Sequence, residues 1–214
     1  MKLFHAETAN EDAYLELVSL LRNGGVIAFP TDTAYGLGAD PFNESAVGRI
    51  FQLKGRPETK PILLLVDSLD MAEQIIQPGD LFQIVASTFW PGPLTVITQA
   101  ATSLPTNVTA GSGTIALRWP TAPFATTVIH RLGGPITATS ANRSGMPSSI
   151  SADEVREQFG DSLDALIDGG QLPSRGGSTL LDLTVDPPVV IRDGPVSFES
   201  LSEFFNGRIR RRVA

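Results

Sequence analysis

The sequence predicts an α/β sandwich built on a twisted, mixed sheet, and three observations predict it. Apolar runs of strand length alternate along the chain with segments whose apolar residues recur at helical spacing. Glycine and proline separate these segments, and no repeat or low-complexity tract interrupts them. A chain of 214 residues, 42% of them hydrophobic, is long enough to bury a core of its own. We therefore expect one domain over residues 1–206, followed by a basic tail over residues 207–214.

Helices are expected where a polar capping residue precedes an apolar stripe. Asn10 and Asn43 each precede such a stripe, and Gly55 ends the second one. Ser151 has Glu154 three residues later, which is the spacing of a capping box. The expected helices cover residues 11–23, 44–54, 69–76, 81–90, 123–132, 152–159 and 197–205.

Strands are expected where short apolar runs lie between turn residues. These runs cover residues 26–29, 61–66, 94–100, 114–119, 135–139, 165–168, 178–184 and 188–192. Residues 30–40, after the first run, have the composition of a turn rich in glycine. There Gly36 and Gly38 are expected to let the backbone approach a ligand closely.

Composition excludes several kinds of site. The net charge is −7 and the pI about 4.8, so any polyanion must be bound by a local concentration of positive charge. The absence of cysteine excludes disulfides, thiolate metal sites and cysteine nucleophiles. Two histidines, His5 and His130, are too few for a histidine-rich metal centre. No apolar run is long enough to span a membrane, and we expect a cytoplasmic protein with no membrane partner.

No standard nucleotide or hydrolase fingerprint is present. The chain lacks the GxxxxGK loop of the P-loop proteins, and no serine lies in a GxSxG elbow. The stretch GSGTIA, which begins at Gly111, lacks the third glycine of a dinucleotide loop and leads into a strand. Any nucleotide must therefore be bound by another scheme.

Cations and small polar side chains lie instead near the ends of the apolar segments. Arg49, Lys54, Arg56 and Lys60 fall within twelve residues, and the stretches PTDT and TSAN each follow an apolar run. Open α/β sheets bind ligands at strand ends, so these groups indicate a crevice for an anion. Simpler interpretations stay open: Lys54 complements the carboxyl end of its helix, and TSAN forms a cap or an Asx turn.

Two arginines belong to otherwise apolar strands. Arg118 follows TIAL, and Arg192 ends PVVI. A buried guanidinium needs a partner, and a carboxylate or phosphate of a ligand is a natural one. Asp182 or Asp193 could serve instead in a purely structural ion pair. His130, on the last turn of an expected helix, is interpreted as a surface residue.

Six short motifs follow one another between Gly24 and Pro195: PTDTAYGLGADP, KGRPETKP, WPGPLT, IALRWP, TSAN and VIRDGP. This ordered set resembles the YrdC/TsaC family of threonylcarbamoyl-AMP synthases, in a short, single-domain form. The resemblance implies a twisted, mostly parallel or mixed sheet with helices on both faces and a large, positively charged cavity. It also implies that L-threonine, bicarbonate and ATP are condensed into threonylcarbamoyl-adenylate and pyrophosphate, for the threonylcarbamoyladenosine modification of tRNA.

Site residues are carried over from the resemblance motif by motif. Lys54 and Arg56 form one signature and are assigned to catalysis, with Lys54 facing the triphosphate and the carboxylated amine. L-Threonine is assigned to Thr33, Arg118, Ala138 and Ser178. ATP is assigned to Arg56, Lys60, Thr114, Ser140, Asn142, Ser148 and Arg192.

The resemblance also implies cofactors and partners. Mg²⁺ is expected on the phosphates, held by substrate oxygens and water because the signatures contain no carboxylate cluster. The adenylate is expected to pass to the tRNA threonylcarbamoyl transferase complex. One position departs from some relatives, which have a histidine in contact with threonine where this chain has Leu65. Selection of threonine is then expected to depend on Thr33, Ser178 or backbone groups.

Two other functions stay open. One is an RNA-binding module, to which the arginines of residues 208–212 would add phosphate contacts. The net negative charge and the lack of aromatic residues among the basic ones count against it. The other is a paralogue that transfers a carbamoyl group to a different acceptor, although such paralogues tend to lose one of the two signatures present here.

Overall fold

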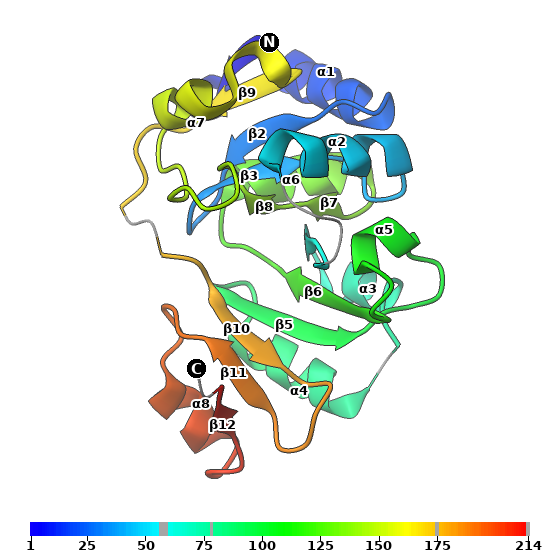
Figure 1. Cartoon of the computed structure of the whole chain (residues 1–214), viewed down its shortest axis with the longest axis vertical. Coiled ribbons are helices and arrows are strands. Elements are labelled where there is room, and N and C mark those ends of the chain that lie inside the picture. The colour runs from blue at the N-terminus through cyan, green and yellow to red at the C-terminus, as the bar shows by residue number, and fades with distance from the viewer. Residues whose placement is uncertain (56–59, 78, 174–175, 213–214) are drawn as a thin grey trace.

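The computed structural model of the chain describes residues 1–55, 60–77, 79–173 and 176–212 (Figure 1). The strands are β1 (Lys2–His5), β2 (Ile27–Pro30), β3 (Tyr35–Gly38), β4 (Leu63–Leu65), β5 (Leu94–Gln99), β6 (Thr114–Arg118), β7 (Ile136–Thr137), β8 (Thr139–Ser140), β9 (Ala165–Asp168), β10 (Thr179–Asp182), β11 (Val189–Arg192) and β12 (Arg210–Arg211). They fall into two sheets, and in Figure 1 β2, β3, β8 and β9 of one sheet lie above β5, β6, β10 and β11 of the other.

The two sheets are both mixed. One has the strand order β1-β9-β2-β3-β8, and the other has the order β12-β11-β10-β5-β6-β4-β7. Of the ten pairings among the described strands, five are parallel and five are antiparallel. The expected mixed α/β fold is confirmed, whereas the division into two sheets and the equal share of antiparallel pairs were not foreseen.

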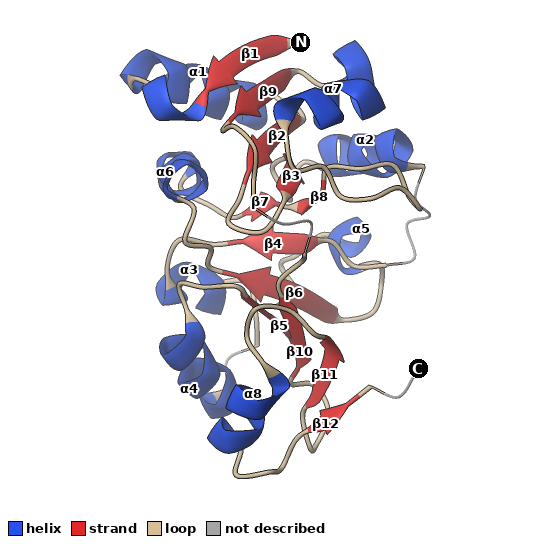
Figure 2. Cartoon of the chain, turned by 90° about the vertical axis from the view of Figure 1, so that its left-hand side faces the viewer, coloured by secondary structure: helices blue, strands red, loops and turns tan. Residues whose placement is uncertain are grey.

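Helices pack on both faces of the five-stranded sheet (Figure 2). The described α-helices are α1 (Glu11–Arg22), α2 (Glu44–Lys54), α3 (Leu69–Glu73), α4 (Asp80–Phe89), α5 (Thr106–Thr109), α6 (Pro123–Leu132), α7 (Ala152–Phe159) and α8 (Phe198–Phe204). Ile27 of β2 belongs to an apolar cluster with α1 and α6, whereas its neighbour Ala28 belongs to a second cluster with α2 and α7. Successive strand residues point to opposite faces, so one strand supports both layers.

The seven-stranded sheet is covered differently. On β5, Leu94 and Val96 are fully buried in the cluster that includes residues of α4 and α8. The alternate residue, Thr95, faces the other side of the sheet and lines a cavity. One face of this sheet therefore supplies core, and the opposite face is available for a ligand.

The local signals for the helices are confirmed. The side chains of Asn10, Asn43 and Ser151 each accept a hydrogen bond from a backbone N–H in the first turn of the helix that follows. Gly55 ends α2 in the left-handed conformation, with φ of 59°. Such caps depend on a few neighbouring residues, which is why the sequence reveals them.

Within residues 1–40, two strands form where none was expected. Residues 35–38, interpreted as part of a glycine-rich turn, form β3 and pair antiparallel with β2. A side chain at Gly38 would lie 2.7 Å from atoms of Phe29 and Ile136, so this glycine serves packing of the core and not access of a ligand. Residues 2–5 form β1 on the edge beside β9, and no strand was expected there.

The basic tail is attached to the sheet. Arg210 and Arg211 form β12, which pairs parallel with β11, and Ile209 beside them is buried in the core. Arg211 also lies near Asp193 and Glu199, at 3.7 and 3.4 Å. The described part of this basic segment therefore extends the larger sheet at its edge, although its arginine side chains are exposed. Within the described ranges, no helix combines the length and apolar character needed to cross a bilayer.

Candidate active site

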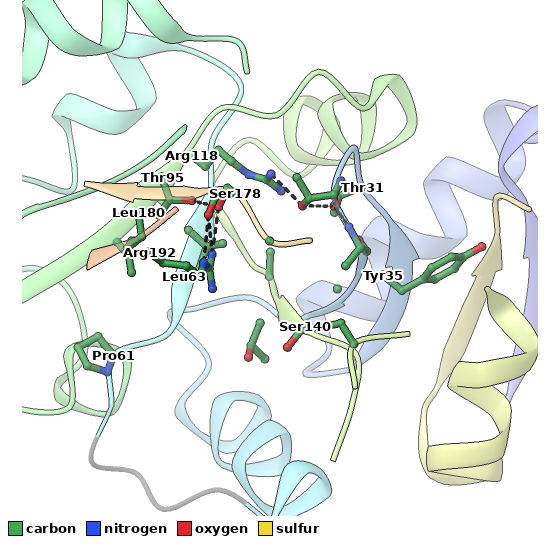
Figure 3. Close-up of a pocket in the computed structure, with 18 residues that line it drawn as sticks. Thr31, Tyr35, Pro61, Leu63, Thr95, Arg118, Ser140, Ser178, Leu180 and Arg192 are labelled. Carbon is green, nitrogen blue, oxygen red and sulfur yellow. Dashed lines mark hydrogen bonds between the residues drawn. The ribbon is translucent and has the colours of Figure 1, made fainter. Parts of the chain in front are cut away.

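A cavity of about 490 Å³ lies between the two sheets (Figure 3). The five-stranded sheet contributes Tyr35, Gly36 and the segment around Ser140, and the seven-stranded sheet contributes its uncovered face. The chain crosses from one sheet to the other at Ala138, because β7 belongs to the larger sheet and β8 to the smaller one. The lining residues are Thr31, Thr33, Ala34, Tyr35, Gly36, Pro61, Leu63, Thr95, Ala116, Arg118, Ala138, Thr139, Ser140, Ser148, Gly177, Ser178, Leu180 and Arg192.

One row of residues crosses the seven-stranded sheet beneath this cavity. Arg192 pairs with Leu180, and Leu180 pairs with Thr95. Continuing the register of β5 and β6 by one pair places Thr95 opposite Arg118, and Arg118 pairs in turn with Leu65. The row brings together segments far apart in the sequence. The first four of these five residues line the cavity, whereas Leu65 lies fully buried in an apolar cluster.

Arg118 is the most deeply buried cation of the site, with a side-chain exposure of 2%. Its Nη1 donates a hydrogen bond of 3.0 Å to Thr33 Oγ1 and lies 3.3 Å from Asp32 Oδ1. Burial lowers the pKa of Arg118, and the nearby carboxylate of Asp32 opposes that shift. Arg118 Nε and Asp32 Oδ1 have no hydrogen-bond partner among the described residues. A buried N–H without an acceptor is costly, so the described residues leave the hydrogen-bonding capacity of this guanidinium incompletely satisfied.

The segment that carries Thr33 is held by a local turn. Thr31 Oγ1 accepts hydrogen bonds from the backbone N–H groups of Thr33 and Ala34, at 3.2 Å each, and donates one of 2.6 Å to Ala34 O. Threonine side chains commonly bond the backbone in this way at turns. The hydroxyl of Thr33 is thereby fixed against Arg118.

Arg192 and Ser178 form a second polar group on the same face (Figure 3). Arg192 donates hydrogen bonds of 3.1 and 2.9 Å to Ser178 O through Nε and Nη2. Burial lowers the pKa of Arg192. The hydroxyls of Ser178 and Thr95 lie 2.6 Å apart. The structural ion pair with Asp182 or Asp193, left open as an alternative, is not what the structure has, because Arg118 lies beside Asp32 and Arg192 donates to Ser178 O.

Two glycines make this arrangement possible. A side chain at Gly177 would lie 2.8 Å from the guanidinium carbon of Arg192. One at Gly194 would lie 2.4 Å from Thr179 N and 2.7 Å from Ser178 C, both backbone atoms that cannot move aside cheaply. The ends of β10 and β11 can therefore approach each other only with glycine at these positions.

Lys54 lies behind the opposite wall, with 4% of its surface exposed. Its amino group donates hydrogen bonds to Ser140 O, to Asn142 O at 2.8 Å and to Asn142 Oδ1 at 3.3 Å. Asn142 Nδ2 donates to Arg143 O and Met146 O, which fixes the orientation of the amide. The amide oxygen must then accept the proton of the Ser140 hydroxyl, 2.5 Å away. Ser140 consequently presents lone pairs, and no proton, to the cavity.

Most of the predicted site residues come together in the structure. All four residues assigned to threonine line the cavity, as do three of those assigned to ATP, namely Ser140, Ser148 and Arg192. Lys54 and Asn142 support Ser140 from behind. Lys60 is exposed and adjoins Pro61, which lines the cavity. Thr114 lies on the cavity face of β6 but outside the lining, and Arg56 lies outside the described residues.

Sequence reasoning missed three contributors to the site. Asp32 was quoted only as part of PTDT, and its partnership with Arg118 spans 86 positions of sequence. Thr95 was quoted only as the last residue of WPGPLT, within an otherwise apolar strand, and no role was assigned to it. Gly194 was likewise quoted only as part of VIRDGP. His130, by contrast, is exposed and pairs with Asp67 at 3.1 Å, which confirms its interpretation as a surface residue.

No group of three or more histidine, cysteine or acidic side chains lies close enough to hold a metal in the part of the chain that the structure describes. Among the described residues, the cavity is lined by the guanidiniums of Arg118 and Arg192 and by several hydroxyl side chains. Such groups bind carboxylates and phosphates and can stabilise charge that moves between them. Fold and site together define a mixed α/β protein whose cavity is lined by guanidiniums and hydroxyls.

The chain belongs to the Sua5/YciO/YrdC family. The model of that family, described as "Telomere recombination", matches residues 19–194. A threonylcarbamoyl-AMP synthase from Pyrococcus abyssi is 39% identical over 191 residues, which cover 89% of this chain and 56% of that protein. A protein of the same name from Halorhodospira halophila is 38% identical over 81% of this chain and 86% of its own length.

Solved structures agree with this assignment. The crystal structure of P. abyssi Sua5 complexed with L-threonine matches with a TM-score of 0.92 at 36% identity, over 99% of this chain and 62% of that one. Escherichia coli YciO matches with a TM-score of 0.81 at 27% identity, over 91% of this chain and 95% of that one. The chain spans little more than half the length of the curated P. abyssi relative.

Proposed function

We propose that the chain is an L-threonylcarbamoyl-AMP synthase, a nucleotidyltransferase that makes threonylcarbamoyl-adenylate and pyrophosphate from L-threonine, bicarbonate and ATP. The observation that carries the proposal is Arg118, buried at the cavity with one N–H that has no acceptor among the described residues. The names of the relatives and the L-threonine in the solved P. abyssi complex support it.

The amino acid binds at the Arg118 end of the cavity. Its carboxylate accepts hydrogen bonds from the N–H groups of Arg118 and lies beside the Thr33 hydroxyl. Asp32, whose Oδ1 lies 3.3 Å from Arg118 Nη1, holds Arg118 in place and opposes the effect of burial on its pKa. The backbone around Ala138 and the hydroxyl of Ser178 complete the pocket for the amino acid.

ATP binds towards Arg192, Ser140 and Ser148, with Lys60 and Thr114 near the rim and Arg56 as a further cation. The resemblance assigns Lys54 to catalysis, but in the structure its amino group is bonded to the Ser140–Asn142 segment. We therefore assign Lys54 to positioning that segment. Mg²⁺ fits this donor set as an ion held by phosphate oxygens and water, and it would supply neutralisation of the triphosphate.

The reaction has two bond-forming steps. The threonine nitrogen forms a bond to the carbon of bicarbonate, a hydroxyl group leaves with a proton as water, and a carbamate results. A carbamate oxygen then attacks the α-phosphorus, and the bond to the bridging oxygen breaks, so that pyrophosphate leaves with the electron pair. Both partners in the second step are anions, so the residues must hold them together against their repulsion.

Fixed guanidiniums perform this role. Arg118 and Arg192 are already held by Thr33 and by Ser178 O, so little reorganisation is needed as charge moves to the leaving group. No nucleophile or general base from the protein is required by this scheme. The product is a reactive mixed anhydride, so it is passed on promptly, and the tRNA threonylcarbamoyl transferase complex in the cytoplasm is the proposed recipient.

Pyrophosphate release tests the proposal. The protein is incubated with ATP, bicarbonate and Mg²⁺, with and without L-threonine, and the products are analysed by mass spectrometry. Release that depends on threonine, together with the mass of threonylcarbamoyl-adenylate, is the expected result. Release that is the same without threonine, or no release while ATP still binds, would show that the amino acid is not the acceptor.

A further inference from the structure

The hydroxyl pair formed by Thr95 and Ser178 has a role beyond support of the fold. Both side chains line the cavity, and both residues are buried, at 2% and 3% exposure. Their oxygens lie 2.6 Å apart, the distance of a strong hydrogen bond between hydroxyls. For Thr95 Oγ1, Ser178 is the sole hydrogen-bond partner within the described ranges.

Counting protons shows what the pair presents to a ligand. Two hydroxyls carry two protons, and the bond between them uses one. Arg192 Nη2 approaches Ser178 Oγ at 3.4 Å, and an arginine can only donate, so it supplies no acceptor for the second proton. Whichever hydroxyl donates to the other, one O–H of the pair lacks an acceptor in the described part of the chain. The cavity is the place where a ligand oxygen can take it.

The position of the pair relative to Arg118 identifies that oxygen. Thr95 lies directly across the strands from Arg118, so their Cβ atoms are about 5 Å apart. On the other side of Arg118, the neighbouring strand provides Leu65, which is fully buried in an apolar cluster. An amino acid whose carboxylate is bound by Arg118 therefore has a hydrogen-bonding neighbour on the Thr95 side, whereas Leu65, on the other side of Arg118, lies outside the cavity lining and offers no hydrogen bond.

From this arrangement we infer that Thr95, together with Ser178, selects the β-hydroxyl of the amino-acid substrate. Thr95 is a specificity-determining residue that sequence reasoning did not identify. The inference rests on the proposed function, because it takes the carboxylate of the substrate to be bound at Arg118. An amino acid without the hydroxyl leaves the pair with a buried, unsatisfied O–H, and sites of that kind reject such analogues strongly.

Three variants of β5 test the inference. Thr95→Val keeps the shape and removes the hydroxyl, whereas Thr95→Ser keeps the hydroxyl. Thr98→Val is the matched control, since Thr98 is also buried but points to the opposite face of the strand. For each protein, kcat/KM is measured with L-threonine, L-serine and L-valine as acceptors, and the affinity for the three amino acids is measured by calorimetry.

We expect Thr95→Val to lower the preference for threonine over valine by about tenfold, which is the effect of one hydrogen bond in a buried site. Its preference for threonine over serine, which concerns the methyl group, should stay the same, and KM for ATP should not change. Thr95→Ser should have the preference of the unmodified protein for threonine over valine. Thr98→Val should have the same preference. A purely structural role of Thr95 would lower all activities together and leave these ratios unchanged.

An unchanged ratio of threonine to valine in Thr95→Val would overturn the inference. Failure of the proposed function is distinguishable, because it appears in the unmodified protein as the absence of threonine-dependent pyrophosphate release. If that protein still binds threonine more tightly than valine, the calorimetric ratios test Thr95 without turnover. If it binds both amino acids equally, the selection itself is absent and the inference is wrong.

Discussion

The two walls of the cavity are built from different chemistry. The wall from the seven-stranded sheet carries both guanidiniums, Arg118 and Arg192, and the hydroxyl pair at Thr95. Among the described lining residues, the opposite wall carries neutral groups, and Lys54 turns its amino group to carbonyls of the Ser140–Asn142 segment behind that wall. The hydroxyls differ as well, since Ser140 presents lone pairs and the pair at Thr95 presents a proton. The comparison teaches that one wall attracts the anions and the other orients them.

The difference follows from where each wall comes from. Arg118 and Arg192 lie on strands whose backbone is fixed by pairing on both sides, so their positions are set by the sheet. Ser140 ends a strand of two residues and leads into a loop, and it needs Lys54 and Asn142 to hold it. A strand needs no such support, whereas a loop that orients a ligand does.

Replacement of Arg118 should have the largest effect. Arg118→Lys keeps the charge but loses the planar donor set that a carboxylate requires, so kcat/KM for threonine should fall at least about 100-fold. KM for ATP should change little, because Arg118 lies at the amino-acid end. Arg118→Met would leave the half-buried Asp32 without its cation and could fail to fold, so the double variant Arg118→Met, Asp32→Asn is the control. Normal turnover in Arg118→Lys would contradict the claim that the wall carrying Arg118 binds the carboxylate of threonine.

Lys54→Met tests the neutral wall. Three oxygen acceptors lose their donor, so the free energy of unfolding in urea should fall by about 1–3 kcal/mol. KM for ATP should rise, since Ser140 is no longer held. If the variant were as stable as the parent and yet inactive, the amino group would act on the substrate directly, and the role assigned to it here would be wrong.

Gly194→Ala tests how closely the charged wall is packed. A methyl group at this position would overlap backbone atoms of residues 178 and 179, so we expect a loss of about 1–3 kcal/mol in unfolding free energy. The displacement should also weaken threonine binding through Ser178. Gly134→Ala is a suitable control, because open space surrounds a side chain there and its φ is not positive. Equal stability of the two variants would contradict the packing described.

Tyr35→Phe should have the smallest effect. The Tyr35 hydroxyl donates to Gly170 O and accepts from Gly169 N, and Figure 3 shows its ring directed away from the other labelled residues. At neutral pH we expect a loss of about 1 kcal/mol in stability and unchanged KM for threonine.

Tyr35 also makes the stability of the fold depend on pH. Burial raises the pKa of Tyr35 above its ordinary value of 10.0. Its contribution to stability is complete below about pH 10, where the unfolded chain also keeps the proton, and it is lost as pH rises towards the folded pKa. The parent protein should therefore lose more stability than Tyr35→Phe between pH 9 and 11. Parallel curves for the two proteins would contradict this.

The sequence predicts the parts of this molecule that depend on neighbours along the chain. Asn10, Asn43 and Ser151 reveal their helices because a cap acts within one turn. Strand β3 was not predicted because its residues are rich in glycine, a composition typical of a turn, and its pairing with β2 cannot be inferred from that composition. Residues 135–139 form one apolar run, yet β7 and β8 belong to different sheets.

The candidate site was predicted in part for the same reason. The arginines were found because a charge in an apolar strand is conspicuous. The partners of Arg118, namely Asp32 and Thr33, are set by the packing of two sheets, and the neighbours Thr95 and Leu65 are set by strand register. A shift of one residue in register would exchange all of these contacts, and nothing local in the sequence fixes it.

The measurement that tests the central claim most directly is the binding of L-threonine and of L-threoninamide to the unmodified protein by calorimetry. The amide differs in having a neutral group where Arg118 is proposed to bind a carboxylate. We predict that L-threonine binds and that the amide binds at least about 100-fold more weakly, because it leaves the buried guanidinium without its anion. Equal affinity for the two compounds would show that Arg118 does not receive the carboxylate, and the account of the charged wall would be contradicted.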